Sequence, residues 1–397
     1  MKVPSPSFNI TKEQLLLDLY KAYTDARRHK KHKINQLEFE YNLEDNLFRL
    51  RNELLENVYR PSPSKCFIIH DPKMREVFAP TFRDRIVHHL LYNYIHKLFE
   101  RHFIYDSYSC IKGKGTHFGI KRLEHHIRSV SRGYTQPCYV LKIDIRGYFM
   151  SINRNILLSQ CNKLINKGRN TVGREFSSTY DASFDFKFVN NLMEICILQN
   201  PLNDCVIIGD IKEWMDLPME KSLFGSKPET GLPIGNLTSQ LFSNVYLNDL
   251  DQYVKRVLKC RNYGRYVDDA FVVSNSKEFL KLNLKKISTF LEENLALNIN
   301  YKKTRIYNAY HGVPFLGSYL LPFRKYIERE SLKRMKSKVN KLEFEDRKLL
   351  QAKINSYLGV MSHNKCFCMR KGIFCLNEKL LKRGYFSSDY LKYIPFH

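Results

Sequence analysis

Three aspartates in apolar, β-prone segments are the strongest chemical feature of the sequence. Asp144 lies in the run 139–145, and Asp268 and Asp269 lie within the alternating segment 263–274. Carboxylates that converge at strand ends repel one another unless a divalent cation lies among them, and Mg²⁺ prefers such ligands. Two ions about 3.5–4 Å apart can activate a 3′-hydroxyl and stabilise leaving pyrophosphate. A single aspartate is more often a turn residue, but three acids framed by strands favour a metal site.

Hydrophobic periodicity predicts the elements that must position these acids. The runs 66–69, 139–145 and 299–320 predict strands, and 263–274 predicts a hairpin with the adjacent aspartates at its tip. Helical spacing is found at 11–30, 36–57, 83–100, 153–200, 237–258, 277–295 and from 331 onward. Residues 201–230, with three prolines, predict a long loop or insertion. The order of elements predicts an α+β core with an antiparallel sheet and a helical C-terminal appendage.

The charge balance indicates a polyanionic partner. Lys and Arg number 65 against 40 Asp and Glu, a net charge of +25. A surface this basic attracts nucleic acid, although it can also be basic without a partner. A hydrophobic fraction of 43% excludes a disordered chain. The N-terminus has no signal peptide and no window is apolar over about 18 residues, which predicts a soluble, cytoplasmic protein without a membrane partner.

Two further clusters are open to more than one interpretation. The ten cysteines are scattered, which predicts reduced thiols. Cys366, Cys368 and Cys375 lie close in sequence but lack the paired spacing and the fourth ligand of a zinc site. The basic run at 27–33 predicts either a solvated helix end or a phosphate contact.

Five segments in order resemble the palm motifs of reverse transcriptases, over roughly residues 60–320. They are 141–149, 231–240, 266–269 with its Tyr-Val-Asp-Asp, 302–304 and 315–317. The Ile234-Gly235-x-x-x-Ser239-Gln240 pattern resembles the bacterial and phage enzymes of diversity-generating retroelements and the related defence-associated reverse transcriptases. The resemblance implies a right-hand polymerase with fingers, a palm containing the antiparallel sheet, and a helical thumb. The domains implied are an N-terminal helical extension at 1–60, fingers and palm at 61–320 with an insertion at about 166–230, and a thumb at 321–397.

The resemblance also implies roles for single residues. Asp144 and Asp268 would bind two Mg²⁺ ions, which Mn²⁺ could replace, with Asp269 and Ile145 as further ligands and Lys303 as a proton donor. The implied nucleotide-binding residues are Lys73, Arg75, Phe149, Gly235 and Gln240. Phe149 falls where the family keeps an aromatic steric gate against ribonucleotides, although its type alone favours a core aromatic. The implied nucleic-acid-binding residues are Arg83, Arg85, Lys112, Lys114, Leu316, Gly317, Lys333 and Lys336.

The function expected is RNA-directed DNA synthesis on a dedicated, structured non-coding RNA, with dNTPs, a DNA primer or product, a companion protein and an oligomeric assembly. Antiviral defence in a bacterial or phage setting is favoured over sequence diversification. A catalytically silent RNA-binding scaffold is the alternative of another class, and RNA synthesis is disfavoured by Phe149. The insertion, with Trp214 and the apolar residues 206–208, is expected to pack on another subunit or on RNA.

Overall fold

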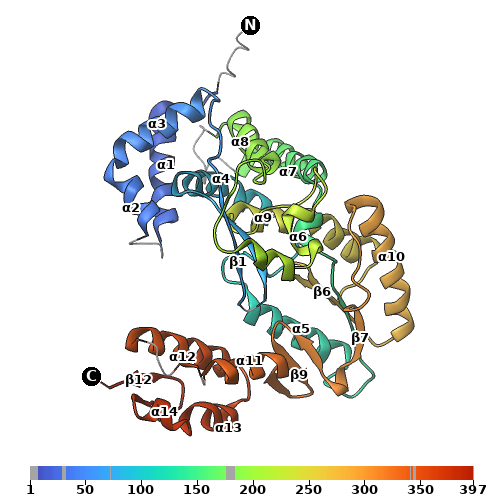
Figure 1. Ribbon diagram of the computed structural model, residues 1–397. Helices are drawn as coiled ribbons and strands as arrows, with labels where there is room; N and C mark the ends of the chain where they lie inside the picture. Colours follow the sequence, from blue (N-terminus) through green and yellow to red (C-terminus); the bar gives the residue numbers. More distant parts are fainter. Residues whose placement is uncertain are drawn as a thin grey trace. The chain divides into compact units, whose positions relative to one another are not determined.

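The computed structural model describes residues 8–28, 33–71, 73–175, 184–339, 341–342 and 346–396, with only the backbone of 168–175 (Figure 1). It divides into two compact units, each built from separate stretches of chain. The first unit comprises Met1–Ile111, Asp144–Cys260 and Leu284–Tyr301, and the second Lys112–Ile143, Arg261–Asn283 and Lys302–His397. This division differs from the three consecutive domains expected from the sequence, which remain a prediction.

The first unit is mainly helical and is built around α4. Its helices are α1 (Lys12–Arg27), α2 (Ile34–Tyr41), α3 (Leu43–Leu55), α4 (Phe82–Glu100), α6 (Tyr148–Ser151), α7 (Arg154–Glu175), α8 (Phe186–Leu198) and α9 (Leu237–Gln252), which continues into a π-helical turn at Tyr253–Val257. Helix α4 begins at Thr81, whose hydroxyl accepts from the backbone N–H of Asp84, and it contacts α1, α2, α7, α8 and α9. Its buried residues include Ile86, Leu90 and Leu91.

One helix that the sequence predicts is two helices in the structure. The segment 36–57 was expected to be continuous, but Asn42 adopts φ −123° and ψ 52° and separates α2 from α3. Across this junction, Asn46 Nδ2 donates to the carbonyl oxygen of Phe39 at 3.0 Å. The backbone at Asn42 therefore interrupts the helix, and the Asn46 side chain connects the two pieces.

A small sheet in the first unit carries the segment that precedes α4. Strands β1 (Lys65–Ile69) and β2 (Arg75–Ala79) form an antiparallel hairpin, with Lys65 opposite Ala79 and Ile69 opposite Arg75. Strand β4 (Val206–Ile207) pairs in parallel with β1 and comes from the predicted loop. The rest of that loop holds short 3₁₀ turns at Ile211–Asp216, Met219–Lys221 and Leu223–Gly225. A two-residue strand is too short to leave a periodic signal.

The second unit contains the predicted antiparallel sheet, which confirms the α+β class. Its order is β5-β6-β3-β7, formed by β5 (Tyr263–Tyr266), β6 (Asp269–Ser274), β3 (Tyr139–Ile143) and β7 (Arg305–Asn308). The central strands β3 and β6 bury most of their residues, as expected for apolar, β-branched runs. Helix α5 (Thr116–Val130) contacts β5 and β6, and α10 (Lys277–Leu295) begins after β6.

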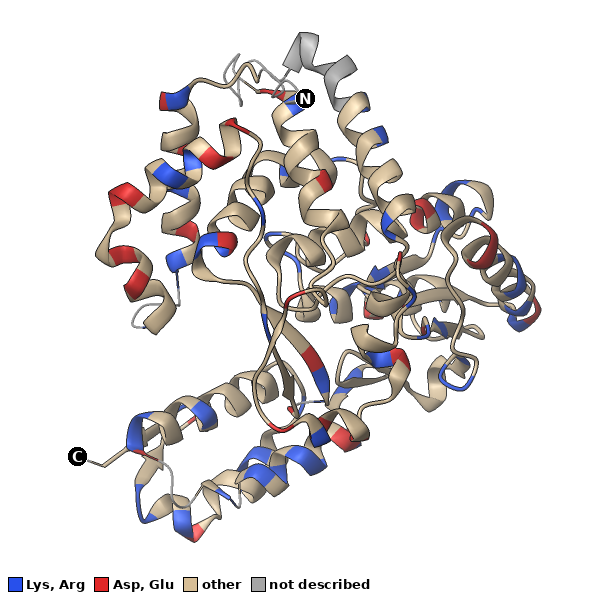
Figure 2. Ribbon diagram, turned by 45° about the horizontal axis from the view of Figure 1, so that its top comes forward, with Lys and Arg blue, Asp and Glu red and all other residues tan. Residues whose placement is uncertain are grey.

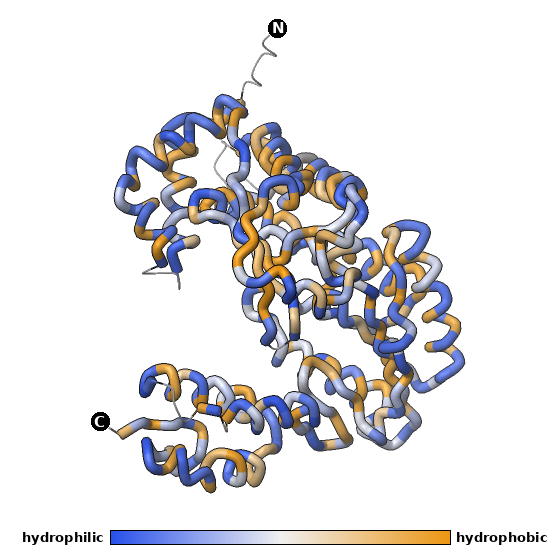
Figure 3. The backbone as a smooth tube through the Cα atoms, viewed as in Figure 1, coloured by the Kyte–Doolittle hydropathy of each residue, from blue (hydrophilic) through white to orange (hydrophobic). Residues whose placement is uncertain are grey.

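The C-terminal part of the second unit has a core of its own. It comprises β8 (Val313–Phe315), β9 (Ser318–Leu321), β10 (Arg324–Ile327), α11 (Arg329–Val339), α12 (Arg347–Ser362), α13 (Phe367–Arg370), α14 (Glu378–Leu381), β11 (Gly384–Phe386) and β12 (Tyr393–Pro395), with a π-helical turn at Lys371–Cys375. Leu350, Ile354, Leu358 and Phe374 are fully buried there. Figure 3 shows apolar and polar stretches alternating along these helices. The sequence predicted mostly helix from 331 onward and did not predict the β11–β12 hairpin.

In the described part of the chain, no helix has the length and apolarity needed to cross a bilayer. The expected turn at 71–73 includes residue 72, and the basic run 27–33 includes 29–32. These positions lie outside the described residues, as does 176–183 of the expected insertion.

Candidate active site

The turn that carries Asp268 is held in a strained conformation. Tyr266 pairs with Asp269, so Val267 and Asp268 form a two-residue connection between β5 and β6. Val267 has φ +54°, a left-handed conformation that β-branched residues rarely adopt and that costs about 1–3 kcal/mol. Arg265, which is fully buried, donates from Nη1 to the carbonyl oxygen of Val267 at 2.8 Å. The turn that carries the aspartate pair is therefore strained, and the hydrogen bond from Arg265 stabilises it in that conformation.

Asp144 follows directly after β3. Ile143, the last residue of that strand, pairs with Ala270, so the chain leaves β3 opposite the first residues of β6. Asn300 donates to Asp144 twice, from its backbone N–H to the carbonyl oxygen at 2.8 Å and from Nδ2 to Oδ2 at 2.9 Å. Ile145, buried, forms an isolated antiparallel bridge with Ile299. Asn300 orients the Asp144 carboxylate, a role that could not be predicted from the sequence.

The donor chemistry of these residues fits Mg²⁺, because carboxylate oxygens are the ligands that this hard cation takes. Within the described ranges, no group of three His, Cys, Asp or Glu side chains is already arranged to hold a metal ion. The same result covers Cys366, Cys368 and Cys375, all of which are described. Cys366 instead packs in the C-terminal core, where burial raises the pKa of its thiol.

Gly235 is required by a contact within the protein. It has φ +137°, and a Cβ there would lie 2.2 Å from the carbonyl oxygen of Phe78. The backbone N–H of Phe78 donates to the carbonyl oxygen of the preceding Ile234 at 2.8 Å. Gly235, which the resemblance assigns to nucleotide binding, thus makes its close approach to β2 within the chain. Gln240 is exposed on α9, and its Oε1 accepts from Cys110 Sγ at 3.3 Å.

Phe149 has contacts of the core type. It is half-buried and packs against a cluster of Cys66, Phe78, Met150 and Leu223. Its carbonyl oxygen accepts from the backbone N–H of Leu232 at 2.8 Å. A steric-gate role remains a prediction beside this packing role.

The β1–β2 hairpin exposes two basic residues. Lys73 follows the hairpin turn, and Arg75 opens β2 opposite Ile69. Both are exposed, and neither is in an ion pair with another described residue. Solvent-facing ammonium and guanidinium groups of this kind suit the oxygens of a phosphate.

The guanidinium of Arg83 makes its contacts within the chain. Its guanidinium donates to Glu53, to Asp84 at 3.0 Å and to the carbonyl oxygen of Arg60 at 3.2 Å, and it lies 4.7 Å from the Tyr59 ring centroid. These contacts argue against the expected role in nucleic-acid binding. They indicate that Arg83 has a structural role, connecting α3 with α4.

Burial lowers the pKa of Arg85 and His88, two basic side chains on α4. Arg85 is half-buried, and desolvation lowers its pKa. The neighbouring His88 is buried, its Nδ1 is 2.9 Å from Thr238 Oγ1 on α9, and desolvation lowers its pKa to about 4. His88 is therefore neutral at pH 7 and serves as a hydrogen-bonded core residue.

The other predicted nucleic-acid contacts belong to the second unit. Lys112 is exposed before α5, and Lys114 Nζ lies 5.9 Å from the Phe118 ring centroid. Leu316 and Gly317 have φ +48° and +79° and form the two-residue turn between β8 and β9. Lys303 is exposed in the turn before β7.

Helix α11 has a basic face and an apolar face. Lys333 and Lys336 are exposed, whereas Met335 and Val339 are buried in the C-terminal core. Figure 2 shows Lys and Arg side by side along the helices of this region. The spacing suits contact with a phosphate backbone.

Replacing Lys333 and Lys336 together by alanine should weaken nucleic-acid binding and its salt dependence. Each lost phosphate contact lowers the log–log salt slope by about 0.7–0.9, so the double variant should lose about 1.4–1.8. Titrations at several salt concentrations measure this slope. The matched control replaces Lys281 and Lys285, exposed at the same kind of spacing on α10. An unchanged slope in the α11 variant would exclude this helix from the interface.

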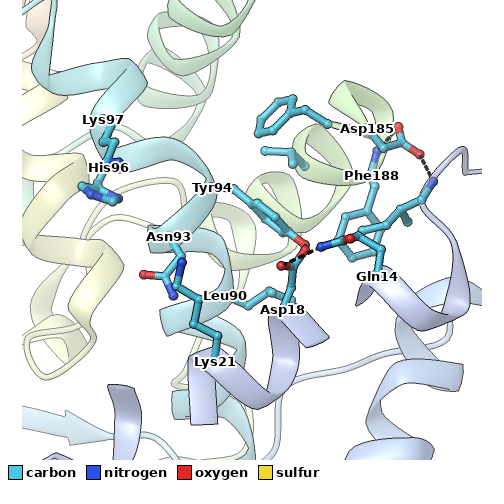
Figure 4. A pocket seen from close by; sticks show the side chains of 13 residues that line it. Gln14, Asp18, Lys21, Leu90, Asn93, Tyr94, His96, Lys97, Asp185 and Phe188 are labelled. Atoms are coloured by element: carbon cyan, nitrogen blue, oxygen red, sulfur yellow. Dashed lines mark hydrogen bonds between the residues drawn. The ribbon is translucent and has the colours of Figure 1, made fainter. Parts of the chain in front are cut away.

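A cavity of about 360 Å³ lies among α1, α4 and the start of α8, away from every predicted site residue (Figure 4). Its carboxylates connect helices. Asp18 accepts from Tyr94 Oη at 2.6 Å and from Gln14 Nε2 at 3.1 Å, and burial with this bond raises the pKa of Tyr94. Asp185 accepts backbone N–H groups at both oxygens, from Ile10 at 3.3 Å and from Lys187 at 2.9 Å. The carboxylates of this cavity therefore serve to connect the packed helices around it.

Comparisons with known proteins identify relatives of the chain. The chain is 24% identical to protein YkfC of Escherichia coli strain K12 over 306 residues, 68% of this chain and 70% of that protein. Solved structures of apo telomerase from Candida tropicalis (TM-score 0.49, 14% identity) and of telomerase from Candida albicans with a fragment of telomeric RNA (0.45, 12%) cover 75% and 82% of this chain. The chain spans 52% and 58% of those telomerase chains.

The family model for reverse transcriptase (RNA-dependent DNA polymerase) matches residues 69–320, which is more than half of the chain and includes both strand-end acid positions. The chain therefore belongs to the reverse transcriptase family of RNA-dependent DNA polymerases.

Proposed function

We propose that this protein copies a dedicated, structured non-coding RNA into DNA at a centre formed by Asp144, Asp268 and Asp269. The observation that carries the proposal is the sheet register. Asp269 opens β6, Asp268 occupies the strained turn, and Asp144 follows Ile143, which pairs with Ala270. This register supports convergence of the three carboxylates at one end of one sheet.

Two bound Mg²⁺ ions would supply activation of the primer 3′-hydroxyl and stabilisation of the departing pyrophosphate. In this proposal Asp144 and Asp268 hold both ions, and Asp269 and Ile145 complete the ligand set. Asn300 keeps the Asp144 carboxylate oriented. Lys303 donates a proton to the leaving pyrophosphate.

The incoming nucleotide is proposed to lie beside the β1–β2 hairpin and the turn before α9. Lys73 and Arg75 bind its triphosphate, which their exposure supports. Phe149 contacts the sugar, and Gly235 and Gln240 border the base and template. Mn²⁺ is expected to replace Mg²⁺, because it accepts the same oxygen ligands.

Metal removal tests the proposal. Incorporation of dNTPs on an RNA template with a DNA primer should stop when the cation is chelated and return when Mg²⁺ or Mn²⁺ is added in excess. Incorporation that persists in the chelator would refute the metal-binding role of the acids. The absence of incorporation with either cation would favour the silent RNA-binding scaffold.

The biological programme is proposed to be antiphage defence, with a diversity-generating retroelement as the alternative. The Ile234-Gly235-x-x-x-Ser239-Gln240 pattern, which both groups share, supports the two programmes together, and the preference for defence rests on the family resemblance alone. Lys112, Lys114, Leu316, Gly317, Lys333 and Lys336 are proposed to contact the RNA and the growing DNA.

The segment 203–221 is proposed to contact a second copy of the chain. Its outer side exposes Ile208, Ile211, Met215 and Met219, the last two at 83% and 75%. The segment has five acidic and two basic residues in a chain of net charge +25. That imbalance disfavours RNA here and favours a basic protein surface, which another copy provides.

Replacing Met215 and Met219 together by serine should therefore reduce the native mass of the assembly and leave incorporation on an artificial primer-template unchanged. Size-exclusion chromatography with light scattering measures the mass. Leu282→Ser, an exposed apolar change on α10, is the control. An unchanged mass in the methionine variant would exclude this contact.

A further inference from the structure

We infer that Glu76 is a positioning residue: its buried carboxylate fastens the segment 214–223 to β2 and so fixes the β1–β2 hairpin relative to the residues that follow Asp144. The inference rests on the proposed function in one respect, namely that Lys73 and Arg75 on this hairpin bind the nucleotide. The contacts themselves lie entirely within the first unit.

The carboxylate of Glu76 is fully buried and depends on donors from the predicted loop. Oε1 accepts from Trp214 Nε1 at 2.7 Å and from Ser222 Oγ at 2.8 Å, and Oε2 accepts from the backbone N–H of Leu223 at 2.6 Å. No basic side chain of the described residues forms an ion pair with it. A buried carboxylate without a cation is tolerated only where hydrogen bonds satisfy its oxygens.

The same segment is attached at its other side to the residues after Asp144. Arg146 Nε donates to Glu220 at 2.5 Å. Gly147 has φ +52°, and a Cβ there would lie 2.5 Å from the carbonyl oxygen of Glu220. Leu223 packs with Met150 in the cluster that also holds Phe78. The segment 214–223 is therefore a bridge: Trp214, Ser222 and Leu223 bond to β2, and Glu220 and Leu223 contact residues 146–150.

This arrangement corrects one expectation from the sequence. Trp214 and the insertion were expected to need another subunit or RNA as a packing surface. Trp214 instead packs on this chain, with its ring 6.4 Å from that of Phe224 and its N–H on Glu76. Only the outer side of the segment is left exposed.

Side chains alternate between the two faces of β2, and this alternation connects Glu76 to the proposed nucleotide site. Glu76 and Phe78 are buried on one face, whereas Arg75 and Val77 belong to the other. The carboxylate thus holds the backbone next to Arg75 while that side chain is exposed. A catalytic group misplaced by about 1 Å can cost about 100-fold, so loosening this bond should act on nucleotide binding first.

Three variants test the inference. Glu76→Gln keeps the shape but turns one acceptor into a donor, and Trp214→Phe removes the Nε1 donor together with part of the ring volume. Asp216→Asn is the matched control, because it makes the same kind of change at an exposed carboxylate of the same segment. Glu76→Gln should raise the dNTP KM about tenfold with kcat within about threefold, since the hydrogen bonds lost are worth about 1–3 kcal/mol. Trp214→Phe should raise KM in the same direction, and Asp216→Asn should leave it unchanged.

A spectroscopic readout does not depend on catalysis. Trp214 is the only tryptophan of the chain, so intrinsic fluorescence reports its hydrogen bond to Glu76. Glu76→Gln should shift the emission to the red, and Asp216→Asn should not. If the wild type incorporates no dNTP, the proposed function fails, and the emission still decides whether Glu76 holds the bridge.

The inference is overturned if folded Glu76→Gln keeps both the wild-type emission and the wild-type KM, or if kcat falls while KM is unchanged. If Glu76→Gln does not fold, Trp214→Phe decides by the same two KM outcomes.

Discussion

Replacing Asp268 or Asp144 by alanine is expected to lower magnesium-dependent dNTP incorporation at least about 100-fold, because the proposed two-metal centre would lose a ligand that nothing else can replace. Asp268 lies in the turn held by Arg265, and Asp144 lies after the last paired residue of β3. Primer extension with purified variants measures the effect. Neither change removes a core side chain, so fold and RNA affinity should remain those of the wild type.

The matched control for these variants is Glu293→Ala, which removes an exposed carboxylate from α10. It should retain full activity, so that loss in the aspartate variants reports their position rather than the charge change. An Asp268→Ala or Asp144→Ala protein that keeps more than about a few per cent of wild-type incorporation would exclude a metal-ligand role.

Replacing Phe149 by alanine or valine is expected to reduce the preference for dNTPs over rNTPs about 100-fold, the discrimination that an apolar contact against one hydroxyl can supply. The measurement is the ratio of kcat/KM for the two nucleotides. Phe149 also packs in a core cluster, so the variant will lose stability. A ratio is insensitive to that loss, because both nucleotides are tested on the same folded fraction.

Met150→Ala provides the control for Phe149, since it removes apolar volume from the same cluster. It should cost about 2–5 kcal/mol of stability and leave the nucleotide preference intact. An unchanged preference in Phe149→Ala would make this residue a core aromatic only and would move the selection against ribonucleotides elsewhere.

Local pattern predicted the elements that present the acids. The β-branched run before Asp144 is β3, the alternating segment around Asp268 is the β5–β6 hairpin, and the apolar spacing from 83 is α4. These features depend on periods of 2 and 3.6 residues, which a single sequence displays. Elements of two or three residues, such as β4 and β11, are too short for such a signal.

Contacts between distant residues could not be predicted in this way. Glu76 and Trp214 are 138 residues apart, and Arg83 and Glu53 are 30 apart. For this reason Arg83 was predicted to contact nucleic acid and Trp214 to contact a partner, although both residues make their contacts within this chain. Gly235 was expected to contact the nucleotide, and the sequence did not show that its nearest neighbour is the backbone of Phe78.

The central claim is RNA-templated DNA synthesis at the strand-end aspartates, and sequencing of nucleic acid tests it most directly. The purified protein is incubated with dNTPs and Mg²⁺, and both the RNA that co-purifies with it and the DNA that it makes are sequenced. DNA complementary to that RNA, absent from Asp268→Ala and from samples treated with ribonuclease beforehand, is the predicted result. DNA that still forms after the RNA has been digested, or that has no complement in it, would contradict the claim.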